Sequence, residues 1–207
     1  MKKVTPYNTL QEARTALDNG GRFYHLMTKS DDGIIAKTEL KKVAGRYSSK
    51  QKMILFLELA ISDLDENGQM RIIEALDEDL KMAYQKYRPE VVVPSQLQSE
   101  RLLGKSVVVT GVPKRVERKT AFKGFVMIPI MVNNVTTFSM VPIIEAYDVY
   151  EIKEMGSNAF AYIAHAKSTV RLEEKPMKIG GVVKELKSEG SEKNTENTFL
   201  EVLYYQE

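Results

Sequence analysis

The chain has 207 residues, of which 43% are hydrophobic and 28% are charged, and its formal net charge is +2. This balance is typical of a folded globular protein and excludes a disordered chain or a strongly basic nucleic-acid-binding protein. The absence of cysteine excludes disulfides, thiolate zinc sites and cysteine nucleophiles.

Two lysines at the N-terminus are not followed by an apolar run, so we expect no signal peptide. No stretch approaches the ~20 apolar residues of a membrane span. A chain without cysteine fits a reducing compartment. We therefore expect a cytoplasmic protein that does not contact a membrane.

Helical signals dominate residues 1–88. A capping box at residues 9–12 and the Gly20-Gly21 pair predict a helix between them. A second box at residues 48–51 opens the apolar run MILFLELAI. Apolar residues then recur at helical spacing from Ile72 to Tyr84, and Pro89 ends that helix.

The second half of the sequence has the pattern of strands. Residues 89–104 are predicted as an extended linker followed by a short helix that stops at Gly104. From residue 105 to 207, six or seven short runs rich in β-branched and aromatic residues are separated by turn residues. This pattern predicts an antiparallel β-barrel or sandwich, so the fold class is α+β.

Residues 63–74 (DLDENGQMRIIE) carry oxygen-bearing side chains at alternate positions, then glycine, then glutamate six residues later. A twelve-residue calcium loop takes oxygen ligands from positions 1, 3, 5, 7, 9 and 12, and it turns at a glycine in position 6. The candidate calcium ligands in this stretch are Asp63, Asp65, Asn67, Gln69 through its carbonyl, and Glu74.

This stretch resembles the loop of an EF-hand, with Gly68 at the turn and the apolar Met70 where paired loops touch. EF-hands come in pairs, and residues 28–39 fit the same frame with Gly33 and Ile35 in the corresponding places. The resemblance covers residues 18–87 and implies a tandem EF-hand module with one calcium ion in the second loop.

The first loop departs from the EF-hand pattern because threonine replaces the first aspartate. Few carboxylates remain to offset the dehydration of calcium. We therefore expect this loop to be weak or empty. Its candidate ligands are Thr28, Ser30, Asp32, Ile34 through its carbonyl, and Glu39.

The leading hypothesis is a non-enzymatic calcium-binding protein whose β-domain contacts an unknown protein partner. We expect no enzyme, because neither an HExxH nor a G-x-S-x-G motif is present.

The alternative is an interaction or single-stranded nucleic-acid-binding β-barrel, similar to an OB-fold, whose helical module holds no metal. Its candidate contacts are Lys114, Arg115, Arg118, Lys119 and Lys123. The near-neutral charge of this half favours instead a solvated hairpin whose lysines guard a sheet edge.

Overall fold

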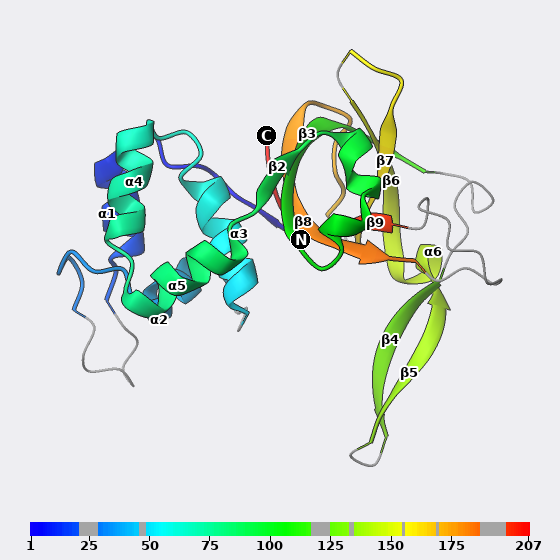
Figure 1. Cartoon of the computed structure of the whole chain (residues 1–207), viewed down its shortest axis with the longest axis horizontal. Helices are drawn as coiled ribbons and strands as arrows, with labels where there is room; N and C mark the ends of the chain where they lie inside the picture. Colours follow the sequence, from blue (N-terminus) through cyan, green and yellow to red (C-terminus); the bar gives the residue numbers. More distant parts are fainter. Residues whose placement is uncertain are drawn as a thin grey trace. The chain divides into compact units, whose positions relative to one another are not determined.

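The structure is a computed structural model that contains both helices and a β-sheet, which confirms the α+β class (Figure 1). It describes residues 1–20, 29–45, 49–116, 125–132, 135–154, 156–168, 170–186 and 198–207. The chain divides into two compact units. The helical unit comprises residues 3–90 with Gln206, and the β unit comprises residues 1–2, 91–205 and 207.

The described residues of the helical unit form five helices: α1 (Leu10–Leu17), α2 (Lys37–Ala44), α3 (Lys50–Ala60), α4 (Glu66–Glu74) and α5 (Glu78–Tyr87). The predicted start of α1 is confirmed, because the Thr9 side chain accepts a hydrogen bond from the Glu12 amide at 3.1 Å. The apolar run MILFLELAI lies in and just after α3, seven of whose eleven residues are buried. This apolar helix supplies much of the core of the unit.

The single long helix predicted to end near Arg88 is instead two helices, α4 and α5. Asp77 separates them because its side chain accepts the amide hydrogen of Leu80 at 2.8 Å and so caps α5. Its other oxygen accepts the Lys37 amide at 2.9 Å, next to the start of α2. A parallel bridge between Ile35 and Leu76 joins the segment that precedes α2 to the segment that precedes α5.

Seven longer strands are found where the structure describes the β unit: β3 (Ser106–Arg115), β4 (Phe125–Val132), β5 (Val135–Pro142), β6 (Tyr147–Lys153), β7 (Phe160–Ala166), β8 (Met177–Glu185) and β9 (Thr198–Gln206). β3 pairs with β6 and β8, β6 with β7, β7 with β9, and β8 with β9. These five strands therefore pair in a closed order, which we call the five-strand ring. β1 (Lys2–Lys3) pairs with β9, and β2 (Glu90–Val92) with β3.

Two features shape the five-strand ring. Residues 89–104, predicted as an extended linker and a short helix, contribute apolar side chains to the core of the ring, where Val92, Leu97 and Leu102 are buried. Leu97 and Leu102 lie in the short 3-10 helices η1 (Pro94–Gln98) and η2 (Glu100–Leu102). Gly181 of β8 lets the strands approach closely, since a Cβ there would lie 2.2 Å from the carbonyl oxygen of Glu201.

β4 and β5 follow β3 and precede β6 in the chain, and they form a separate two-stranded sheet. The short helix α6 (Ile143–Ala146) follows them. Ile143 and Val126 are buried with Val149 and Phe199 in a second, smaller apolar cluster. No helix within the described ranges is both long and apolar enough to traverse a bilayer.

Candidate functional site

The predicted second calcium loop is helical over most of its length. α4 begins at Glu66, and Asp65 is its N-cap, with the Gly68 amide donating to Asp65 Oδ1 at 2.8 Å. Asn67 and Glu74 lie in this helix seven residues apart, a rise of about 10 Å. This backbone differs from the predicted loop, because Asn67, Gln69 and Glu74 lie in a helix that Asp65 caps.

The other predicted ligands of this loop have local partners. The Gln69 side-chain amide donates to the carbonyl of Leu64 at 2.8 Å. Asp63 lies ahead of α4 and accepts a hydrogen bond from the Ser62 hydroxyl at 3.2 Å. The structure has a helix here in place of the predicted loop, and an aspartate three residues before a glycine also satisfies the N-cap of a helix. Calcium binding itself stays a prediction. Binding in the predicted loop conformation would require the start of α4 to unwind.

Carboxylates of the predicted first loop accept hydrogen bonds from the backbone. Glu39 is fully buried, and its two oxygens accept the amide hydrogens of Gly20 and of Ala36, the latter at 2.8 Å. Asp32 accepts the amide of Ile34 at 3.0 Å, and the Ile34 side chain is exposed. These carboxylates therefore cap turns of the chain.

The remaining positions of this loop do not complete a metal site. Ser30 forms an isolated bridge with Asn19, and Thr28 lies outside the described residues. Ile35 bridges Leu76, whereas Met70, the expected partner, lies exposed on α4. Within the described ranges, no three His, Cys, Asp or Glu side chains are grouped as a metal ion would require.

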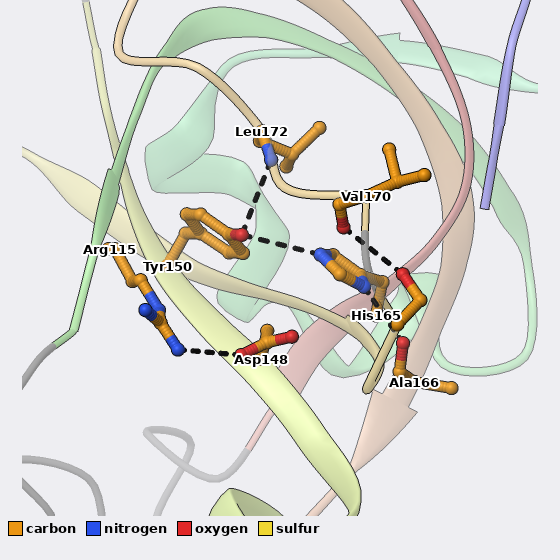
Figure 2. A network of polar contacts seen from close by, with 8 residues as sticks. Arg115, Asp148, Tyr150, His165, Ala166, Val170 and Leu172 are labelled. Atoms are coloured by element: carbon orange, nitrogen blue, oxygen red, sulfur yellow. Dashed lines mark hydrogen bonds and ion pairs between the residues drawn. The ribbon is translucent and has the colours of Figure 1, made fainter.

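The predicted basic segment is divided by the pleat of β3. Lys114 lies opposite Glu151 on the outer face of the five-strand ring and is exposed. Arg115 lies on the inner face, where its guanidinium contacts Asp148 at 2.9 Å (Figure 2). Arg115 is therefore engaged with the barely exposed carboxylate of Asp148. Arg118, Lys119 and Lys123 lie outside the described residues.

An aromatic pair lies on the outer face of β7. Phe160 is 39% exposed, Tyr162 is half-buried, and their ring centroids are 5.5 Å apart at an interplanar angle of 83°. Phe160 lies opposite Lys153, and Tyr162 lies opposite Glu151, which lies opposite Lys114. We call Lys114, Lys153, Phe160 and Tyr162 the aromatic–lysine face.

A buried polar network lies on the inner side of the same strands (Figure 2). The Tyr150 hydroxyl oxygen accepts the Leu172 amide at 3.3 Å and lies 3.3 Å from Nε2 of His165. His165 Nδ1 lies 2.9 Å from the carbonyl oxygen of Ala166 and must donate to it. Nε2 is then the acceptor of the Tyr150 proton, which fixes the tautomer of the neutral imidazole.

Burial controls the protonation of this network. Loss of water around the fully buried imidazole lowers the pKa of His165 below its ordinary value. Burial also raises the pKa of the Tyr150 hydroxyl, which therefore keeps its proton at neutral pH. The network thus stays uncharged around the histidine and anchors the segment between β7 and β8, through Leu172, to β6.

Known protein families and curated proteins yield no match to this chain. The functional proposal therefore depends on the geometry above. Neither Phe160 nor Tyr162 was among the candidate site residues predicted from the sequence. The alternation in FAYIAHA was the available signal, because it sets Phe160 and Tyr162 on one face and Ile163 and His165 on the other.

Proposed function

We propose that the protein binds single-stranded nucleic acid on the aromatic–lysine face of its β unit. The observation that carries the proposal is the Phe160–Tyr162 pair on successive outward positions of β7. Every nucleobase has an apolar face that stacks on an aromatic ring, and stacking contributes about 1–3 kcal/mol per base. Bases in a duplex are stacked on each other, so the preferred ligand is single-stranded.

The order of strands supports this site. The pairing order of the five-strand ring resembles that of the OB-fold, a five-stranded, partly open Greek-key barrel that binds oligonucleotides on its second and third strands and on nearby loops. In the five-strand ring those strands are β6 and β7, which carry Lys153, Phe160 and Tyr162. The basic segment that follows Lys114 starts where the first ring strand ends.

The charge of the face predicts moderate affinity. Lys114 and Lys153 can contact phosphates of the nucleic acid. Glu151 lies between Lys114 and Tyr162, and its carboxylate repels those phosphates. For single strands, each neutralised phosphate changes the slope of log K against log salt by about 0.7. We therefore expect replacement of both Lys114 and Lys153 by alanine to reduce the slope by about 1.4.

Fluorescence anisotropy with labelled oligothymidine and oligouridine tests the proposal. Phe160→Ala and Tyr162→Ala are each expected to weaken binding by about 5- to 150-fold, which corresponds to one lost stacking contact. The double variant Lys86→Ala/Tyr87→Ala is the matched control. It removes one lysine and one aromatic residue from α5, in the helical unit, and should leave binding unchanged.

Two outcomes would reject this function. The first is no binding of either oligonucleotide at low salt, which would favour a protein partner for the β unit. The second is equal weakening by the aromatic–lysine variants and by the α5 control. Circular dichroism of each variant separates loss of binding from loss of folding.

A further inference from the structure

The Glu151 carboxylate lies in the middle of the surface proposed to bind nucleic acid. It belongs to the outer side of β6, with Lys114 of β3 opposite it on one side and Tyr162 of β7 opposite it on the other. A carboxylate in this place repels the phosphates that the lysines attract. A residue that lowers the general affinity of a binding face can still raise its specificity, because it disfavours the wrong ligands more than the right one.

Glu151 has no partner in the folded protein, in contrast to a comparable carboxylate of the ring. Glu201 of β9 accepts a hydrogen bond from the Tyr147 hydroxyl at 2.9 Å and pairs with the Lys184 ammonium at 2.8 Å. Within the described ranges, no side chain forms a hydrogen bond or ion pair with the Glu151 carboxylate, although Lys114 lies directly opposite. This half-buried carboxylate is therefore available to a ligand.

The neighbouring tyrosine determines where a base would meet this carboxylate. Glu151 and Tyr162 are directly opposite residues of an antiparallel pair, so their Cβ atoms lie about 4.5–5.5 Å apart. A nucleobase that stacks on the Tyr162 ring is wider than this spacing. Its edge therefore extends to the side on which Glu151 lies, while its face stays on the ring. A single base can then be stacked by β7 and read at its edge by β6.

The hydrogen-bonding groups of the bases decide which edge fits a carboxylate. An ionised carboxylate only accepts hydrogen bonds, and it has two oxygens. Guanine carries two N–H donors side by side, on N1 and on the exocyclic N2. Adenine and cytosine place one amino group beside a ring nitrogen that is an acceptor. Uracil and thymine place one N–H between two carbonyl oxygens. Guanine is thus the base whose donors match both carboxylate oxygens.

We propose that Glu151 makes guanine the preferred base at Tyr162, an inference that rests on the proposed binding of single strands to this face. A stacked base removes water from the carboxylate, so a base without matching donors leaves a charge without hydrogen bonds. Uracil and thymine are disfavoured most, because their carbonyl oxygens face the carboxylate. A well-formed bidentate contact discriminates between bases by about 5- to 150-fold.

Fluorescence anisotropy with oligouridine of about nine nucleotides, with and without one central guanine, tests the inference. The guanine should tighten binding to the unmodified chain by about 5- to 150-fold, and a central adenine or cytosine should tighten it much less. Inosine lacks only the N2 amino group of guanine and should bind about 2- to 12-fold more weakly than guanine does. The same series with deoxyribose should give the same order, because the contact does not involve the sugar.

Two variants assign the preference to this carboxylate. Glu151→Gln keeps the shape of the side chain but offers one oxygen and no charge. It should lose most of the preference for guanine and bind oligouridine at least as tightly as the unmodified chain, which also shows that it is folded. Glu100→Gln is the matched control, because it removes the same charge from an exposed residue of η2, outside the aromatic–lysine face. This control should keep the full preference.

The outcomes separate this inference from the function on which it rests. If no strand binds at low salt, or if Phe160→Ala leaves oligouridine binding unchanged, the proposed function fails and the inference fails with it. A different result overturns the inference alone. In that case oligouridine binds and Phe160→Ala weakens its binding, but a central guanine gives no gain over uracil, or Glu151→Gln keeps the preference for guanine.

Discussion

Lowering the pH below 6.5 is expected to destabilise the β unit through His165. The imidazole is fully buried, and its Nε2 accepts the Tyr150 proton, so the folded protein binds a proton less readily than the unfolded chain does. The folded pKa is lowered, and the stability contribution is therefore complete above the unfolded value of about 6.5. It is lost as the pH falls from there toward the folded pKa.

The size of this effect follows from proton linkage. Each pH unit between the two pKa values costs about 1.4 kcal/mol of unfolding free energy. Urea unfolding slopes for small proteins are about 1–3 kcal/mol per molar, so the midpoint should fall by about 0.5 to 1.4 M per pH unit. Tyrosine fluorescence reports the transition, since the chain has ten tyrosines and no tryptophan.

The control is His165→Gln, which keeps an acceptor for the Tyr150 proton but does not titrate. Carboxylates that do not interact with this residue contribute equally to both proteins, so the difference between their pH profiles reports the imidazole together with its interaction with Asp148. The reasoning is refuted if the unmodified chain and His165→Gln lose the same stability between pH 7.5 and 5.

Three further predictions concern stability. Tyr150→Phe removes the hydroxyl that contacts the buried histidine and a backbone amide, and it should lower the unfolding free energy by about 1–3 kcal/mol in urea titrations at pH 7.5. Gly181→Ala drives a Cβ into a β9 carbonyl and should cost at least about 1–3 kcal/mol in the same assay; an unchanged midpoint would contradict the close strand approach. Asp65→Ala removes the N-cap of α4 and should cost about 1 kcal/mol equally with calcium and with chelator. A loss seen only with calcium would instead support the metal loop.

Local signals in the sequence were sufficient where a single interaction determines the structure. The Thr9 cap and the apolar run of α3 could be predicted because capping and burial act within one helix. The spacing of Asp63, Asp65, Asn67 and Gly68 did not decide between a calcium loop and a helix start. An aspartate before a glycine serves both, and the choice depends on the free energy of packing α4 within the helical unit.

The candidate site was harder to predict because it depends on which side of each strand faces inward. Lys114 and Arg115 are neighbours in the sequence, yet the pleat directs one to the outer face and the other to Asp148. Both faces of β7 carry apolar residues, so alternation alone does not identify the exposed one. Closure of the five-strand ring decides this, and it requires pairings between residues far apart in the chain, such as Ile163 with Leu200.

Photochemical cross-linking of a 5-iodouracil-containing single strand to the full chain tests the central claim most directly. If the aromatic–lysine face stacks bases, mass spectrometry should find the oligonucleotide attached to Phe160 or Tyr162, and the cross-link should disappear in the Phe160→Ala/Tyr162→Ala variant. Cross-links confined to other segments, and unchanged by that double substitution, would contradict the account.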